Sequence, residues 1–334
     1  MFFLRSTGRV ELNIQNETEM KQSLPMKLLT LKPRLSIVLI TFNRDKLLQR
    51  TLTQIFAENS PLKNLKIHIL DNGSTDKTPS ICSYYKEIFP NLSYSRNALN
   101  AGGNANICKA FEIGFSVPSE YIWVLCDDDF YDFSHWKEVE EGLEKDPDVL
   151  LVERKIDFKT ISTDLTPYFI NTMAFVPAGI YHKRCFSSTV LQNMYINLYT
   201  GMPHLAIGCG VLNRSGKILY TDHPIIKQEL RFEFSRGTDK FIHHRQIHCN
   251  LFSAFIASYA LIKNKQLRRE CCNVLWVGKS FFYSMYKFWK SNGLYPHNVS
   301  EVFLGVDFKG KILFLLSGVA VIYLKLYRKI RENF

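Results

Sequence analysis

Runs of apolar, often β-branched residues alternate with helix-like segments four times in the first half of this chain. The first run reads LSIVLIT over residues 35–41, and such a continuous apolar stretch is typical of a strand buried on both faces of a parallel sheet. In the segment that follows, Leu48, Leu52 and Ile55 recur at helical spacing. Further strand-like runs cover residues 65–71, 92–96, 121–126 and 149–152. The alternation predicts an α/β fold with a mostly parallel central sheet, flanked by helices and joined by right-handed crossovers.

Polar residues gather where these predicted strands end. Thr41 and Asn43 follow the first strand, and the sequence DNGSTD follows the second. The third strand leads into residues 97–106, which include NAGGNAN, and three aspartates follow the fourth. Because ligands of such sheets bind outside the carboxyl ends of the strands, we expect these four segments to converge on one crevice.

The three aspartates, Asp127, Asp128 and Asp129, come directly after the apolar run YIWVLC. Adjacent like charges repel one another unless a cation or solvent compensates them. Carboxylate oxygens suit hard divalent cations such as Mg²⁺ or Mn²⁺, and a cation bound here could also hold a diphosphate. A solvated acidic turn is the alternative, but the position at the end of a buried strand favours a metal site.

The sequence DNGSTD begins with Asp71. A carboxylate at a strand end can accept hydrogen bonds from a pyrimidine N–H or from ribose hydroxyls, and Gly73 permits a tight turn. An ordinary turn rich in Asp, Asn and Ser is the alternative interpretation.

The motifs SIVLITFNR, ILDNGSTD, NAGGNAN and WVLCDDD occur in this order and spacing. On these residues the chain resembles the family 2 glycosyltransferases of the GT-A fold, above all the bacterial enzymes that build lipopolysaccharide, O-antigen or capsule chains. The resemblance covers residues 35–153. It implies a metal-dependent, inverting transfer of a sugar from a nucleotide-diphosphate sugar to a hydroxyl of a lipid-linked or envelope glycan acceptor.

Position by position, the resemblance also implies roles for individual residues. Thr41 and Asn43 would border the nucleotide pocket, and Asp71 would contact the base. The residues expected to bind the donor are Thr41, Asn43, Asp71, Asn100, Gly103, Asp127 and Asp128. Asp129 and Asp127 are the candidate ligands of Mg²⁺ or Mn²⁺, with Asp128 as the competing ligand.

Two positions depart from the family pattern. Cys126 stands where the first acidic residue of the metal motif is usual, which leaves the register of the metal ligands open. Many members carry a Glu-Asp pair in the acceptor half, after a segment similar to AGIYHKRCF. The comparable place here reads GMPHLAI, so His204 is the candidate general base, since a histidine can take a proton from an acceptor hydroxyl. A structural histidine is the alternative, and Asp157, Asp222 and Glu229 are competing bases.

The positive charge of the chain, +11 at pH 7, is concentrated at its C-terminal end. Residues 263–334 hold 13 Lys and Arg against 4 Asp and Glu. Basic residues flank an uncharged run of 13 residues, 312–324, which is shorter than the roughly 20 that a membrane-spanning helix needs. We therefore expect this region to attach the protein to an anionic membrane surface. A terminal helix packed on the domain is the alternative.

These observations predict the organisation of the chain. We expect an N-terminal extension over residues 1–33, a GT-A domain over 34–240 and a helical, basic C-terminal region over 241–334. The donor half of the domain would end at residue 153. The eight cysteines are scattered without a CxxC pair, which favours a reducing compartment. The expected location is the cytoplasm, on the inner face of the cytoplasmic membrane.

Other functions stay open from the sequence. A polyprenyl-phosphate sugar transferase would share the same donor motifs. A non-catalytic basic protein that binds membrane or nucleic acid would explain the departures from the metal and base motifs. His244, His248 and Cys249 could bind zinc, and FFYSMYKFWK over residues 281–290 could stack on nucleic acid, but structural roles are favoured for both. We therefore expect no nucleic-acid partner.

Overall fold

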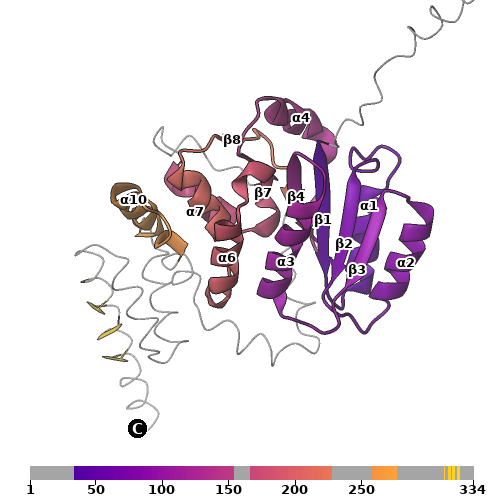
Figure 1. The fold of residues 1–334 in the computed structure, drawn as a ribbon, viewed down its shortest axis with the longest axis horizontal. Coiled ribbons are helices and arrows are strands. Elements are labelled where there is room, and N and C mark those ends of the chain that lie inside the picture. Colours follow the sequence, from indigo (N-terminus) through magenta and orange to yellow (C-terminus); the bar gives the residue numbers. More distant parts are fainter. Residues whose placement is uncertain are drawn as a thin grey trace, which may run out of the picture. The chain divides into compact units, whose positions relative to one another are not determined.

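In the computed structural model, residues 34–153, 166–227 and 258–276 are described, together with single positions between 312 and 323. Strands and helices alternate along the first of these segments (Figure 1). Its elements are β1 (Leu35–Thr41), α1 (Asp45–Ile55), β2 (Lys66–Asp71), α2 (Thr78–Ile88), β3 (Leu92–Arg96), α3 (Gly103–Ser116), β4 (Tyr121–Cys126), β5 (Phe130–Tyr131), η1 (Phe133–His135), α4 (Trp136–Glu144) and β6 (Val149–Leu151). The later elements are α5 (Thr166–Met173), η2 (Val176–Ala178), β7 (Gly179–His182), η3 (Lys183–Cys185), α6 (Ser188–Ile196), η4 (Leu198–Thr200), α7 (Leu205–Asn213), β8 (Ile218–Tyr220), β9 (Ile226–Lys227) and α10 (Lys265–Trp276).

Seven strands form the central sheet, in the order β3-β2-β1-β4-β7-β6-β8. The neighbours β3, β2, β1 and β4 run parallel to one another, and β6 pairs with β8 in parallel. Strand β7 runs antiparallel to both β4 and β6. The sheet is thus mostly parallel, as predicted, with one antiparallel strand, β7, inserted between β4 and β6. A separate pair is formed by β5 and β9.

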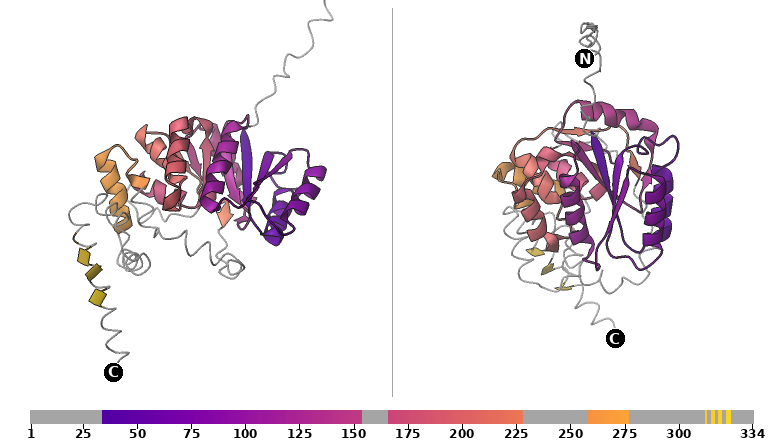
Figure 2. Two further views of the ribbon diagram at one scale, coloured as in Figure 1. Left: turned by 60° about the horizontal axis from the view of Figure 1, so that its bottom comes forward. Right: turned by 45° about the vertical axis from the view of Figure 1, so that its right-hand side comes forward.

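Helices cover both faces of the sheet, as the right-hand view of Figure 2 shows. Alternate residues of a strand point to opposite faces. On β1, Leu39 packs in the same apolar cluster as Leu48 and Leu52 of α1. Val38 packs in the other cluster with Phe111 of α3. Burial on both faces explains why β1 is apolar along its whole length.

The sequence expectations for the first half are confirmed closely. The bounds of β1, β3 and β4 are those predicted, and β2 begins one residue later. The later half, in which the sequence pattern gave no order, contains the antiparallel strand.

Several sequence expectations concern residues outside the described part of the chain. These are the N-terminal extension, the possible zinc ligands His244, His248 and Cys249, and the aromatic segment 281–290. Six cysteines are free thiols, namely Cys82, Cys108, Cys126, Cys185, Cys209 and Cys271. Within the described residues, we find no helix with the length and apolar character needed to cross a membrane.

Candidate active site

The loop after β1 ties the first two strand ends together. Asn43 has a left-handed backbone, with φ of 48°. Its side-chain Oδ1 accepts a hydrogen bond of 2.7 Å from the backbone N–H of Thr75. Its own backbone N–H donates to Oγ of Ser74, at 2.9 Å. The polar residues after β1 and β2 therefore lie side by side, as the topology of a parallel sheet predicts.

Asp71, at the end of β2, is fully buried and has protein partners on both carboxylate oxygens. Oδ1 accepts hydrogen bonds from the backbone N–H and the hydroxyl of Ser74, at 2.8 and 2.6 Å. Oδ2 accepts one from the Tyr94 hydroxyl at 2.9 Å. Gly73 has φ of +82°, and a Cβ there would lie 2.9 Å from the carbonyl carbon of Leu99. The turn thus requires glycine, and Asp71 holds its shape.

An amide network joins this turn to the loop after β3. The side-chain N–H of Asn72 donates to Oδ1 of Asn100 at 2.7 Å, and that of Asn97 donates to Oδ1 of Asn72 at 2.9 Å. Oδ1 of Asn100 also accepts from the backbone N–H of Gly102 at 2.8 Å. Gly103 then begins α3, and a Cβ added to it would meet no atom within 4 Å. The first turn of a helix has backbone N–H groups without partners inside the helix, and together with the free space beside Gly103 this position is suited to an anion.

Asp127 is buried and connects the acidic triplet to the loop after β1. Its Oδ2 accepts a hydrogen bond of 2.6 Å from the Thr41 hydroxyl. Its Oδ1 lies 3.0 Å from Nη1 of Arg44. Burial raises the pKa of Asp127 to about 6, although Arg44 opposes this effect. The strand ends of β1 and β4 are thus joined by direct side-chain contacts.

Asp129 is also buried, but its Oδ2 has no hydrogen-bond partner among the described residues. Burial, together with the charges of Asp128, Asp127 and Glu153, raises the pKa of Asp129 to about 8. A buried carboxylate without a compensating partner is costly. A bound cation would remove that cost, so the residues present fit a metal site.

Three side chains place candidate ligand atoms within 4.8 Å of one another, namely those of Cys126, Asp128 and Asp129. Burial and the three neighbouring aspartates raise the pKa of the Cys126 thiol well above its ordinary value. A protonated thiol is a poor ligand, whereas hard divalent cations prefer oxygen. Asp128 and Asp129 are therefore the better-placed candidates, because both oxygens of Asp127 are engaged, by Thr41 and Arg44, whereas Arg44 contacts only one oxygen of Asp128.

Arg44 is a residue of this site that our sequence analysis did not single out. Its Nη1 lies 3.0 Å from Asp127 and 2.7 Å from Asp128, so one guanidinium neutralises part of the charge of the triplet. The arginine stands at the end of the motif SIVLITFNR, which was the available signal. Its partners lie more than 80 positions further along the chain, and only the fold reveals them.

His204 lies away from these contacts, in the apolar core beside α7. It is 1% exposed, and its ring stacks at 6.5 Å on Phe111 of α3. Its Nε2 is 2.7 Å from the carbonyl oxygen of Met173 and donates to it. Burial lowers the pKa of His204 to about 4. These surroundings are those of a structural histidine.

The other candidates for the general base lie elsewhere in the chain. Asp222 is exposed in the connection between β8 and β9, whereas Asp157 and Glu229 lie outside the described residues. Glu153, which follows β6, was not considered from the sequence. It is buried, it bridges to Ile226 of β9, and its charge contributes to the raised pKa of Asp129. Glu153 is therefore a carboxylate near the acidic triplet that the sequence pattern alone did not indicate.

Comparison with known proteins shows which family this chain resembles. The model of the family described as glycosyl transferase family 2 matches residues 36–212. The abequosyltransferase RfbV of Salmonella typhimurium is 23% identical over 286 residues, which cover 75% of this chain and 82% of that protein.

Solved structures also resemble this one. The S. aureus TarS 1–349 structure in complex with UDP-GlcNAc is similar with a TM-score of 0.53 and 16% identity, over 89% of this chain and 92% of that chain. The complex of the same protein with UDP gives a TM-score of 0.55 at 15% identity, over 90% and 92% of the two chains. At this level of identity the likeness concerns the fold.

Proposed function

This chain belongs to glycosyl transferase family 2 and has the GT-A fold, and from this premise we propose that it transfers a sugar from a nucleotide-diphosphate sugar, with inversion, to a hydroxyl of a lipid-linked or envelope glycan. The observation that carries the proposal is the buried carboxylate of Asp129, near the joined ends of β1 and β4, whose Oδ2 has no partner among the residues that the structure describes. A metal-dependent diphosphate site accounts for this costly arrangement.

Asp128 and Asp129 would hold a divalent cation, Mg²⁺ or Mn²⁺, with Asp127 behind them. When bound, such a cation stabilises the negative charge that develops on the leaving diphosphate. Arg44 lowers the repulsion among the carboxylates, because its guanidinium contacts both Asp127 and Asp128. Thr41 fixes Asp127 through its hydroxyl, so that the triplet keeps one orientation.

The nucleotide would lie over the loops after β1 and β2. Asn43 and Asp71 hold these loops in place, and Asn100 connects them to the start of α3. The open space at Gly103 leaves room for the donor beside the first turn of that helix. Backbone N–H groups at a helix N-terminus favour phosphate oxygens, which supports a position for the diphosphate between α3 and the triplet.

The identity of the general base stays a prediction. His204 is neutral at pH 7 because burial lowers its pKa, but its Nε2 hydrogen already bonds to Met173. If His204 is the base, His204→Ala should lower the transfer rate by about 10² to 10⁴-fold, the usual contribution of general-base catalysis. If it is structural, the variant should lose stability while the folded fraction keeps its rate.

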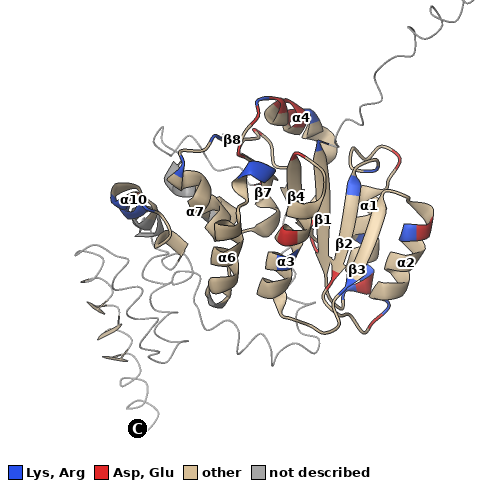
Figure 3. Cartoon of the chain, in the orientation of Figure 1, with Lys and Arg blue, Asp and Glu red and all other residues tan. Residues whose placement is uncertain are grey.

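The family and the charge of the chain support the proposed class of acceptor. The relative RfbV is an abequosyltransferase, which supports an envelope sugar acceptor such as a lipopolysaccharide, O-antigen or capsule precursor. The basic residues of α10 appear in blue in Figure 3 and continue the positive C-terminal region. Exposed apolar side chains recur there at helical spacing, at Ile312, Leu315, Leu316, Val319, Ile322 and Tyr323. Such a surface supports peripheral binding at the inner, anionic face of the cytoplasmic membrane.

Flotation with anionic vesicles tests this membrane attachment. We expect Leu316→Glu combined with Ile322→Glu to weaken vesicle binding, because both side chains are more than half exposed on the apolar surface. Ile196→Glu is the matched control, since Ile196 is 69% exposed at the end of α6. Equal flotation of the double variant and the control would remove the role of this surface.

The donor proposal is tested by thermal unfolding of the full chain with UDP, GDP, CDP or dTDP, each with and without Mn²⁺. We expect one nucleotide to raise the unfolding temperature only when the metal is present, because the triplet binds the diphosphate through it. The matching nucleotide sugars should then be hydrolysed slowly in the absence of acceptor. A protein that neither binds a nucleoside diphosphate nor turns over any sugar donor would instead fit the non-catalytic alternative.

A further inference from the structure

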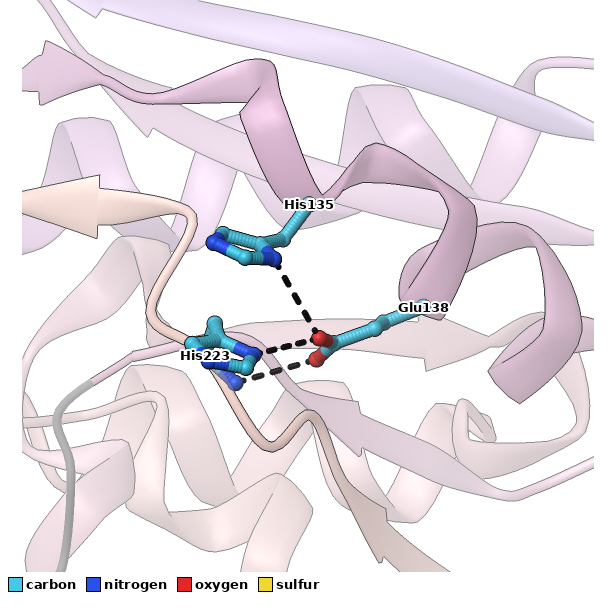
Figure 4. Close-up of side chains that lie close together, drawn as sticks. All are labelled: His135, Glu138 and His223. Carbon is cyan, nitrogen blue, oxygen red and sulfur yellow. Dashed lines mark hydrogen bonds and ion pairs between the residues drawn. The ribbon is translucent and has the colours of Figure 1, made fainter.

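A second group of possible metal ligands lies apart from the acidic triplet. His135 ends η1, Glu138 stands in the first turn of α4, and His223 lies in the connection between β8 and β9. Figure 4 shows both imidazole rings beside the Glu138 carboxylate. Their ligand atoms all lie within 4.8 Å of one another. None of the contacts that join these three residues involves the residues proposed to bind the donor.

Nδ1 of both histidines lies near one oxygen of Glu138, and the rings need only turn for their in-plane lone pairs to reach one ion. Nδ1 of His223 lies 2.5 Å from Oε1 of Glu138, and Nδ1 of His135 lies 3.6 Å from the same oxygen. The two rings stack at a centroid distance of 3.8 Å, with only 6° between their planes. The second oxygen of Glu138 accepts a hydrogen bond of 3.0 Å from the backbone N–H of His223. This last bond fixes the carboxylate and leaves Oε1 facing both rings.

We propose that His135, Glu138 and His223 bind a Zn²⁺ ion, or another borderline divalent metal, in a site separate from the active site. Two imidazole nitrogens and one carboxylate oxygen form a common zinc donor set, in which water completes the coordination. Nδ1 of His223 must carry no hydrogen when the metal binds, because only a nitrogen lone pair coordinates a metal, and its contact with Glu138 then gives way to the shared ion. The side chains are 25% to 53% exposed, so the ion has an open path to the site.

The carboxylate is ready to act as a ligand. Both oxygens of Glu138 contact His223, one through the imidazole Nδ1 and the other through the backbone N–H, and these two contacts hold the carboxylate in one orientation. The backbone hydrogen bond corresponds to the outer partner that commonly orients a metal-ligating carboxylate.

The position of this site in the fold gives it a structural consequence. The backbone N–H of Asp132 donates to the carbonyl of Ile225 at 2.8 Å, and β5 pairs with β9 beside it. Strand β5 follows Asp129 directly. A metal held by His135, Glu138 and His223 would thus clamp the segment after the acidic triplet to the segment that carries β9. The bound metal would hold β5 and β9 together beside the acidic triplet without contacting the donor.

Zinc binding to the full-length protein tests the proposal, with excess Mg²⁺ present to occupy the hard-cation site. The readouts are equilibrium dialysis against Zn²⁺ and the absorption spectrum of the Co²⁺-substituted protein. We expect the wild type to bind one Zn²⁺ per chain. His223→Ala and Glu138→Gln should each weaken this binding more than about 100-fold, because even outer partners of metal ligands contribute 10 to 100-fold.

Two controls make the outcome specific. His182 also lies near a carboxylate, 3.7 Å from Asp146, but without a second histidine, so His182→Ala should leave zinc binding unchanged. Asp129→Asn should also leave it unchanged, which separates this site from the proposed catalytic metal. Zn²⁺ should raise the unfolding temperature of the wild type and not of His223→Ala. If His223→Ala and Glu138→Gln bind zinc like the wild type, or if the wild type binds none, the three residues are only a hydrogen-bonded surface cluster.

Discussion

Replacing Asp129 with asparagine should stabilise the metal-free protein while abolishing sugar transfer. The carboxylate is buried, and its Oδ2 has no partner among the described residues. Its pKa is raised from 3.8 to about 8 by burial and by the neighbouring carboxylates. The folded state therefore binds this proton more tightly than the unfolded chain does. It follows that the stability of the metal-free protein falls as the pH rises from about 4 to about 8.

The size of this effect follows from the pKa. One pKa unit corresponds to about 1.4 kcal/mol, and pH 7 lies roughly three units above the ordinary value, so Asp129 costs at most about 4 kcal/mol there. Burying the asparagine amide also costs free energy, which offsets part of this gain. We therefore expect Asp129→Asn to raise the free energy of unfolding of the metal-free protein by about 2 kcal/mol at pH 7. At pH 5 the gain should be much smaller, because both the folded and the unfolded states are then closer to the same protonation.

Urea unfolding in EDTA at pH 5, 7 and 8 measures the stability, and turnover of the donor with Mn²⁺ measures the activity. We expect Asp129→Asn to lose more than about 100-fold in rate, in line with the loss of a group that stabilises transition-state charge. The matched control is Glu144→Gln, because Glu144 is exposed at the end of α4 and its replacement should change the stability by less than about 0.5 kcal/mol. An Asp129→Asn protein that is active, or that shows the same pH dependence of stability as the wild type, would refute this account.

Two further perturbations test the scaffold around the site. Burial would raise the pKa of Asp148, but hydrogen bonds from Arg214, Arg184 and the Lys217 backbone lower it to about 2. The ionised carboxylate should therefore contribute about 2 kcal/mol to the free energy of unfolding above pH 4, and this contribution should be lost as the pH falls toward 2. Urea unfolding at several pH values measures it, and the stability of Asp148→Asn should depend less on pH in this range. Gly73→Ala should cost about 1 to 3 kcal/mol, because the turn needs positive φ and the added Cβ would meet the backbone at 2.9 Å. The same variant should weaken nucleotide binding, and unchanged stability would show that the turn can relax.

The catalytic scaffold was predictable because its strands are buried on both faces. A run such as LSIVLIT allows little besides an internal strand, so the bounds of β1, β3 and β4 followed from the sequence pattern. The parallel order of these strands then places Thr41, Asp71 and Asp127 at one edge of the sheet, as the hydrogen bond between Thr41 and Asp127 shows. Strand β7 was different, because a short antiparallel strand has no local signal that fixes its neighbours or its direction.

By itself, the sequence determined which loops form the site, since apolar periodicity and turn residues act over a few positions. Only the tertiary structure decided how deeply each side chain of the site is buried and which partners it has. Asp127 is satisfied by Thr41 and Arg44, whereas Asp129, two residues later, is buried and finds no partner for Oδ2 within the described part of the chain. Likewise, His223 meets Glu138 across 85 positions of the chain. Burial and charge pairing arise from contacts between distant segments, and these are fixed only when the sheet and its covering helices pack.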